Sequence, residues 1–240
     1  MAVISTKAVV LSSLKYGDSS LIVKCYTYEE GIKSYLIRGI LKPKRGGLKT
    51  AYFQPLTQLK VVANHTNKGN LNSIKEVNIT YPYKTIHTNI VKQTIVLFLS
   101  EILSNCIQEE EENTALFIYL ETALIWLDLH DKIANFHLLF LLNLTRFLGF
   151  YPDISEIDKN GFSLLEGNFT NAIYQKNVIS RNDFYQFKKL LGIDFDDIEG
   201  VFFNKQERQS LLQIIIQYFK LHLDGFRNPK SLQILEAVFN

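Results

Sequence analysis

The chain has 240 residues, and with 47% hydrophobic and 12% aromatic residues it has enough apolar surface for a folded core, which excludes a disordered protein. Its two cysteines, Cys25 and Cys106, are too few for a disulfide framework or a four-cysteine metal site, and they fit a reducing cytoplasm. The net charge of +2 hides an uneven distribution, because residues 1–80 hold 12 Lys and Arg against 4 acidic residues, whereas residues 81–240 hold 14 against 20.

The first 80 residues are predicted to form a small β-barrel. Short runs rich in Val, Ile, Thr and Tyr are separated by turn residues, and they cover 6–11, 21–28, 32–38, 57–62 and 70–79. Five short strands in one such segment are typical of a barrel. Because both the charge and the pattern change after residue 80, we expect two domains, 1–80 and 81–240.

The second part is predicted to be mainly helical. Apolar residues recur at helical spacing from residue 83 to Cys106, and similar patterns predict helices over 114–129, 132–148, 204–223 and 231–239. Asn204 and Glu207 have the spacing of a capping box. Between residues 152 and 180 the helical period is lost among turn residues, which indicates an inserted hairpin or loop. The expected fold class is therefore α+β, a β-barrel followed by a helical domain.

No signal peptide or membrane span is expected. Lys7, Lys15 and Asp18 interrupt the first 20 residues. The most apolar stretches, 95–103 and 136–144, are shorter than the roughly 20 residues that cross a bilayer. These features predict a soluble cytoplasmic protein.

Few features predict catalysis. Ser19 and Ser20 lie in a segment like a hydrolase nucleophile block, but no histidine follows an aspartate by three residues, as the partner block of that group requires. The chain also has no P-loop, His-Glu-x-x-His or Cys-x-x-Cys motif. We therefore expect no enzymatic activity, no cofactor and no metal.

The basic residues of the first part predict a nucleic-acid interface, because neutralising phosphates releases counterions and gives affinity. Side chains alternate along a strand, so Lys33 and Tyr35 share one face and Arg38 lies on the other, and we expect basic and aromatic groups together at the surface. Aromatic rings stack on unpaired bases for about 1–3 kcal/mol each, which favours single strands. The predicted contact residues are Lys24, Lys33, Tyr35, Arg38, Lys42, Lys44, Arg45 and Lys49.

Ordered segments along most of the chain resemble the RecO family of bacterial recombination mediators. They are KAVVL (7–11), YGDSSLIV (16–23), RGILKPK (38–44), FQPL (53–56), LGFYP (148–152) and KSLQIL (230–235). The resemblance implies an N-terminal OB-fold, a helical domain and no enzymatic turnover. It also implies binding of single- and double-stranded DNA, strand annealing, and cooperation with RecR in loading RecA onto DNA coated by single-stranded DNA-binding protein (SSB). A place at the bacterial nucleoid follows from that role.

Two further expectations come from the resemblance. Many RecO proteins carry four zinc-binding cysteines after the LGFYP-like segment, but this chain has none there, so we expect 152–180 to be a metal-free remnant. Its apolar support should come from Phe162, Leu164, Phe169 and Tyr174. The family also docks the acidic, phenylalanine-ended tail of SSB in an apolar pocket rimmed by a cation, and the residues at helical spacing that we expect to supply it are Phe140, Asn143, Arg146 and Phe147.

Three other functions stay open at the level of sequence. An OB-fold RNA-binding protein would share the basic barrel, because phosphate contacts do not distinguish a 2′-hydroxyl from hydrogen. A hydrolase would use Ser19 or Ser20. A non-catalytic adaptor would turn its basic face toward an acidic protein.

Overall fold

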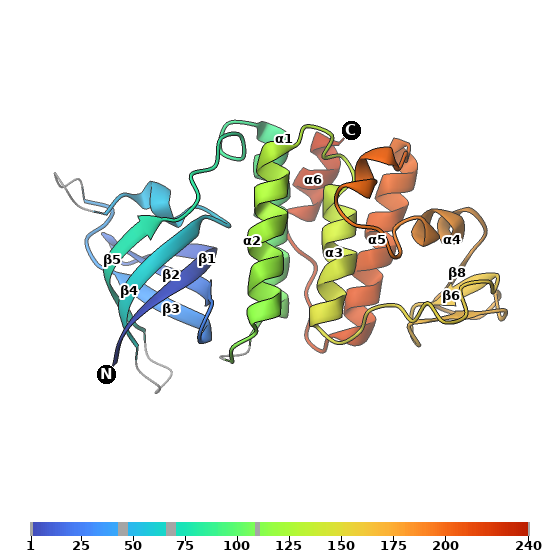
Figure 1. Ribbon diagram of the computed structural model, residues 1–240, viewed down its shortest axis with the longest axis horizontal. Coiled ribbons are helices and arrows are strands. Elements are labelled where there is room, and N and C mark those ends of the chain that lie inside the picture. Colours follow the sequence, from blue (N-terminus) through green and yellow to red (C-terminus); the bar gives the residue numbers. More distant parts are fainter. Residues whose placement is uncertain (1, 43–47, 66–70, 109–110, 240) are drawn as a thin grey trace. The chain divides into compact units, whose positions relative to one another are not determined.

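Two compact units make up the computed structural model, which describes residues 2–42, 48–65, 71–108 and 111–239. Unit 1 covers Met1–Asp128 and unit 2 covers Leu129–Asn240. In Figure 1, unit 1 runs from blue to green and unit 2 from green to red. The expected change from strands to helices does occur after residue 80, whereas the division into functional domains at that point stays a prediction.

Unit 1 begins with a five-stranded antiparallel sheet in the order β3-β2-β1-β4-β5. The strands are β1 (Ala2–Tyr16), β2 (Ser20–Thr27), β3 (Gly31–Ile37), β4 (Gln58–His65) and β5 (Ser73–Ile79), with the 3₁₀ turn η1 (Thr50–Phe53) before β4. The sheet is not a closed barrel, but one parallel bridge between Tyr35 and Asn72 connects β3 to the residue that precedes β5. This arrangement is consistent with an OB-fold, and the predicted class, an N-terminal β-fold followed by helices, is confirmed.

The longest strand differs most from its prediction. We expected 6–11, but β1 covers Ala2–Tyr16 and pairs with β4 along its first half and with β2 along its second. A bulge between Val10 and Ser12 shifts the register, and a bulge bends its strand and increases its twist. The apolar run before Ser12 marked the middle of the strand, whereas its polar end, 12–16, carries no such signal.

The interior of the sheet forms the first core. Inward side chains of all five strands meet there, and the largest is the fully buried Tyr35. Other buried members are Ala8, Val10, Val23, Leu59, Val61 and Val77. These residues alternate along each strand with a period of two, as expected for the buried face of a sheet.

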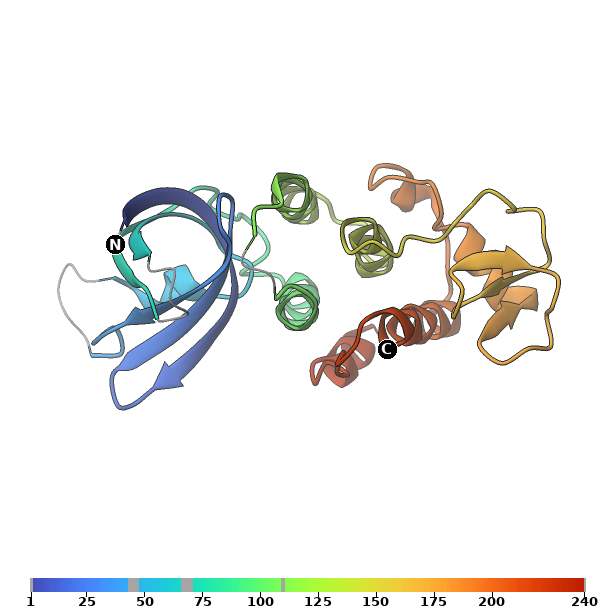
Figure 2. The ribbon, with the colours of Figure 1, turned by 90° about the horizontal axis from the view of Figure 1, so that it is seen from below.

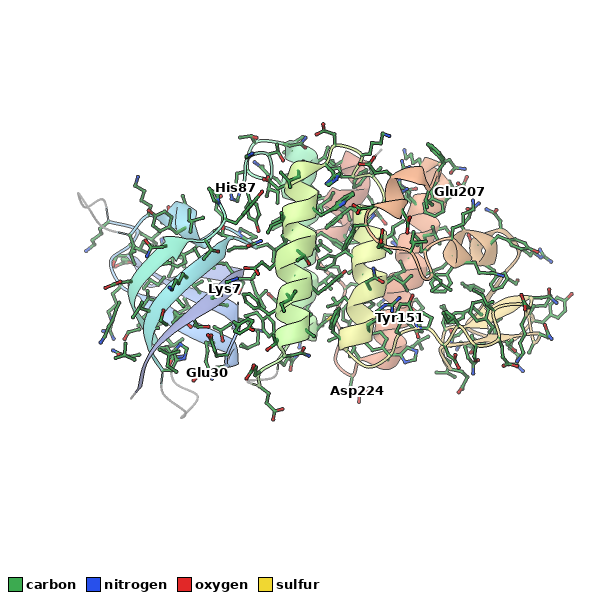
Figure 3. The ribbon with its side chains drawn as sticks, viewed as in Figure 1. Lys7, Glu30, His87, Tyr151, Glu207 and Asp224 are labelled. Carbon is green, nitrogen blue, oxygen red and sulfur yellow. The ribbon has the colours of Figure 1, made fainter. Side chains whose placement is uncertain are left out.

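Two helices pack on the outer side of β1 and β2. They are α1 (Ile90–Cys106) and α2 (Thr114–Leu129), which Figure 2 shows nearly end-on beside the sheet. The rings of Tyr26 and Phe117 lie 6.1 Å apart and bury the outer surface of β2. Lys7, labelled in Figure 3 on the side of the sheet next to α2, forms an ion pair with Glu121 at 2.9 Å. Unit 1 is therefore larger than the sheet alone.

The end of α2 is fixed by Asp128, which is only 1% exposed. Its carboxylate accepts hydrogen bonds from the backbone N–H groups of Lys84, Thr85 and Ile86 at 2.9, 2.8 and 3.0 Å. The ammonium group of the buried Lys92 in α1 donates to the backbone oxygen of Asp128 and to the hydroxyl of Thr85. Burial by itself raises the pKa of the Asp128 carboxyl, but the backbone hydrogen bonds outweigh it, and the pKa lies below its usual value.

Unit 2 consists of helices and one small sheet. The helices are α3 (Phe136–Phe147), α4 (Arg181–Lys188), α5 (Lys205–His222) and α6 (Leu232–Val238), with the 3₁₀ turn η2 (Asp197–Gly200). The predicted capping box is confirmed, because the Asn204 side chain accepts from Glu207 N at 2.9 Å and the Glu207 carboxylate accepts from Asn204 N at 2.8 Å. Helix α4 was not predicted, because its eight residues are too few to establish a helical period.

The segment expected to hold a hairpin forms a three-stranded antiparallel sheet. Its strands are β6 (Gly161–Ser163), β7 (Asn168–Thr170) and β8 (Val178–Ser180), in the order β7-β6-β8. Phe162, Leu164 and Phe169 are buried as expected. Tyr174, by contrast, is 91% exposed, so the prediction that it supports this segment is wrong. Throughout the described ranges of the chain, every helix is too short or too polar to cross a bilayer.

Candidate nucleic-acid interface

Four exposed cations gather at one end of the five-stranded sheet of unit 1. We call this set, Lys15, Arg38, Lys42 and Lys49, the basic loop surface. Lys15 pairs with Leu21, which in turn pairs with Ile37, so Lys15 and the end of β3 lie two strand spacings apart, roughly 10 Å. The surface therefore combines the end of β1 with the loop that follows β3.

Backbone contacts hold the loops of this surface together. The N–H of Leu41 donates to the carbonyl oxygen of Ser19 at 2.9 Å, which joins the loop after β3 to the β1–β2 turn. Gly17 and Gly39 have φ values of +59° and +71°, and this left-handed conformation is one that glycine adopts without strain. The hydroxyl of Ser13 donates to Phe53 O at 2.6 Å and places η1, which follows Lys49, against β1.

Two of the predicted contact residues, Lys44 and Arg45, lie outside the described residues. Arg38, Lys42 and Lys49 are exposed, and each side chain has the freedom to reach a phosphate oxygen. Lys15 was not among the predicted contacts, because its neighbours in β1 are not basic. Only the pairing of β1 with β2 shows that it shares an end of the sheet with Arg38.

Lys24 has a structural role instead. Its ammonium group donates to the backbone oxygens of Ser104 and Ile107 at 3.0 and 3.3 Å, at the C-terminal end of α1. A cation there satisfies carbonyl groups that the helix leaves unpaired and interacts well with the helix dipole. Burial lowers the pKa of the Lys24 ammonium group. The expectation that Lys24 is available to nucleic acid is therefore not supported.

Lys33 and Tyr35 point into the sheet, so the expectation that they lie at the surface is wrong. Lys33 is 7% exposed, with its ammonium group 3.8 Å from the Glu30 carboxylate. The Tyr35 hydroxyl lies 2.9 Å from Nε2 of His65, whose Nδ1 lies 2.5 Å from Glu30. Lys33 and Tyr35 do share one face of β3, as predicted, but that face points into the sheet interior rather than to the surface. Burial raises the pKa of the Tyr35 hydroxyl.

The two ends of the sheet differ in charge. The β2–β3 turn carries Glu29 and Glu30, at the end opposite the basic loop surface, and Figure 3 labels Glu30 there. The hydroxyl of Thr6 donates to Glu29. At the loop end the exposed cations outnumber the one exposed carboxylate of the β1–β2 turn, Asp18, so the two ends differ in net charge.

An exposed aromatic residue next to the cations was missed by the sequence reasoning. Tyr16, the last residue of β1, is 54% exposed and follows Lys15 directly. Leu14 and Leu41 are also exposed at this end, at 65% and 36%. The sequence signal that could have marked Tyr16 is its position directly before Gly17, where a turn ends the strand. Tyr16 is therefore the exposed aromatic residue beside the basic loop surface, the position that was expected for Tyr35.

The residues expected to dock a partner tail do not form one surface. Phe140 is fully buried in α3, with its ring 5.8 Å from that of Phe136, so its expected place in a surface pocket is wrong. Arg146 is exposed, and its guanidinium carbon lies 3.7 Å from the ring centroid of Tyr151. Asn143 and Phe147 are partly buried.

A small apolar hollow with cations lies elsewhere in unit 2, between α3, the start of α5 and α6. We call it the α5–α6 hollow; its lining includes Lys205, Arg208, Leu212, Leu235 and Phe239. Buried His137 also lines it, and His137 Nδ1 and Arg208 Nε have no hydrogen-bond partner among the described residues. Burial and the Arg208 charge lower the pKa of His137 to about 3, so the imidazole is neutral. The residues that line this hollow come from segments far apart in the sequence, so no sequence pattern predicted it.

In unit 1, His65 is engaged with Tyr35 and Glu30 at the acidic end of the sheet, away from Ser19 and Ser20 in the β1–β2 turn. Across the part of the chain that the structure describes, no three His, Cys, Asp or Glu side chains are grouped so as to hold a metal ion.

Comparison with known proteins identifies the family. The model described as "Recombination protein O N terminal" matches residues 1–83, and that described as "Recombination protein O C terminal" matches residues 87–233. Proteins named DNA repair protein RecO from Flavobacterium johnsoniae and Flavobacterium psychrophilum are 51% and 49% identical over 237 residues, which is 99% of either chain. The protein of that name from Bacteroides fragilis is 35% identical over 239 residues, 98% of both chains. The chain therefore belongs to the RecO family of bacterial DNA repair and recombination proteins.

Proposed function

We propose that this chain is a non-catalytic recombination mediator that binds single- and double-stranded DNA through its basic loop surface. It anneals complementary strands and, together with RecR, helps to load RecA onto DNA coated by SSB. Its place of action is the nucleoid, in the cytoplasm. Its contribution is to hold strands and partners together, and no residue is assigned a covalent step.

Four exposed cations at one end of an antiparallel sheet support this proposal more than any other feature. Lys15, Arg38, Lys42 and Lys49 come from different segments, yet strand pairing and the Leu41–Ser19 hydrogen bond bring their segments together. Phosphates are equally accessible on single strands and duplexes, so this surface serves both. The exposed ring of Tyr16 adds a stacking partner that only unpaired bases can use.

The first test is a salt series in which a labelled single-stranded oligonucleotide is titrated with the protein and followed by fluorescence anisotropy. With four phosphates neutralised at about −0.7 per contact, log affinity should fall against log salt with a slope of about −3. Additional phosphate contacts from Lys44 and Arg45 would make this slope steeper. Absence of binding at low salt would contradict the proposal and favour the adaptor function.

A matched RNA oligonucleotide separates the DNA-binding function from the RNA-binding alternative. We expect RNA to compete no better than DNA of the same sequence, since the basic loop surface supplies phosphate contacts and a stacking ring rather than a 2′-hydroxyl site. Strong preference for RNA in this competition would favour the alternative.

For the SSB tail, we propose the α5–α6 hollow as the docking site. Its two cations, Lys205 and Arg208, outnumber its one carboxylate, Glu236, and so favour an acidic peptide. Leu212, Leu235 and Phe239 supply an apolar wall against which the terminal phenylalanine would lie. Arg146, with its neighbours Asn143 and Phe147, remains the alternative site. Its guanidinium group already lies over the Tyr151 ring, which leaves it less available.

Two charge reversals distinguish these sites. Lys205 and Arg146 are both exposed, so Lys205→Glu and Arg146→Glu should fold normally. We expect Lys205→Glu to weaken binding of an SSB tail peptide by about tenfold, as for the loss of one charged hydrogen bond, and Arg146→Glu to leave it unchanged. Isothermal titration calorimetry measures both. The reverse result would assign the tail to the Arg146 side of α3.

A further inference from the structure

A second hollow, in unit 1, lies between the loop before β4 and the first half of α1. Its volume is about 260 Å³. The floor is apolar and firmly packed, because Ile86 is fully buried and Val96 is 4% exposed. Pro55 and Leu97, which is 42% exposed, form the walls. The hollow therefore offers flat, apolar contact to a group that enters from solvent.

Three neutral polar side chains complete the lining: Gln54, His87 and Gln93. Figure 3 labels His87 on the segment between the sheet and α1. The amide nitrogen of Gln93 donates to His87 O, and its amide oxygen remains a potential acceptor. Within the described residues the Gln54 amide and the His87 ring nitrogens make no hydrogen bond. Burial lowers the pKa of His87, so its ring is neutral and offers one donor and one acceptor.

Size and charge restrict the occupant. The volume lies just below the roughly 300–1,000 Å³ of common small-molecule sites, so one compact group fits and a large cofactor does not. None of the described residues that line the hollow is Lys, Arg, Asp or Glu, so nothing among them would neutralise an entering phosphate or carboxylate. Apolar walls with amide donors and acceptors at the edge are the surroundings in which proteins hold an unpaired base.

The hollow is also close to the basic loop surface along the chain. Lys49 is the fifth residue before Gln54, and η1 lies between them. Since five residues span at most about 18 Å, a strand held at Lys49 can reach the hollow within a few nucleotides. A strand running this way leaves its phosphates in solvent beside the cations and turns a base inward.

From these observations we propose that the hollow lined by Gln54, Pro55, Ile86, Gln93, Val96 and Leu97 binds one unpaired nucleobase of the strand on the basic loop surface. The inference rests on the proposed DNA-binding function. It assigns to this chain a contact that duplex DNA cannot make, because paired and stacked bases do not enter a hollow. A preference for unpaired strands follows.

The test compares two single-stranded oligonucleotides of equal length, one of thymidine and one of abasic nucleotides, which carry the same phosphates. The wild-type protein should bind the thymidine strand at least about tenfold more tightly, since the hollow contributes one base contact and the Tyr16 ring can add another. Leu97→Trp fills the hollow, and Gln54→Ala combined with Gln93→Ala removes its hydrogen-bonding groups. Both should lower the ratio by about tenfold, leaving only the part contributed by the Tyr16 ring, and should not change affinity for the abasic strand.

Ile90→Trp is the matched control, because Ile90 is 67% exposed on the same helix but does not line the hollow. It should keep the wild-type ratio. If Leu97→Trp and the glutamine variant also keep that ratio, the base site is overturned while DNA binding stands, and a protein side chain becomes the occupant to consider. If neither strand binds at low salt, the proposed function itself fails.

Discussion

Reversing three cations of the basic loop surface, Arg38→Glu, Lys42→Glu and Lys49→Glu together, is expected to weaken single-stranded DNA binding by on the order of a hundredfold or more. Each reversal removes a phosphate contact and adds repulsion, and about 1 kcal/mol per site gives at least 3 kcal/mol. The salt slope should become about 2 units shallower, because each lost contact contributes about 0.7. Fluorescence anisotropy across a salt series measures both quantities.

A control with the same change in net charge separates a local contact from a general charge effect. Lys60, Lys75 and Lys176 are exposed and lie outside the basic loop surface, so reversing these three should change affinity by only a few-fold. All six positions are exposed, and both variants should unfold at the wild-type denaturant concentration. Equal losses in both variants would mean that DNA binding is not localised at the loop end.

The fold was largely predictable because its signals are local. Runs rich in Val, Ile, Thr and Tyr between turn residues predicted all five strands of unit 1, and the capping pair Asn204 and Glu207 marked the start of α5. The signal failed where an element was short, as in α4, or polar, as at the end of β1. Such segments are held by pairing with distant residues, which one sequence does not display.

The candidate interface was predictable in charge but not residue by residue. Basic residues within one loop, such as Arg38 and Lys42, were correctly placed at the surface. Lys24 and Lys33 have the same charge, yet Lys24 contacts the end of α1, whereas Lys33 faces the interior of the sheet. The difference depends on which face of a strand is covered and by what. That is decided by elements up to 80 residues away, as the Lys24–Ser104 contact shows.

Replacing Asp128 should have the largest effect on stability. Asp128→Ala leaves three backbone N–H groups, those of Lys84, Thr85 and Ile86, without their acceptor. Because Ile86 is buried and Thr85 partly buried, we expect a loss of about 3 kcal/mol. Asp128→Asn retains the acceptor that serves Thr85 and Ile86, so its loss should be nearer 1 kcal/mol. Urea unfolding measures both, and Trp126, the single tryptophan, lies in α2 and reports on unit 1.

The pH dependence follows from the lowered pKa of this carboxyl. A group whose pKa is lower in the folded state stabilises it fully above its unfolded pKa, about 3.9, and loses that contribution as pH falls through the folded value. The advantage of the wild-type protein over Asp128→Asn should therefore be constant near neutral pH and shrink below about pH 4. Asp131→Ala removes an exposed carboxylate three residues away and should cost less than about 0.5 kcal/mol. If Asp128→Ala were as mild as that control, the hydrogen bonds to residues 84–86 would not be what fixes the start of α1 against the end of α2.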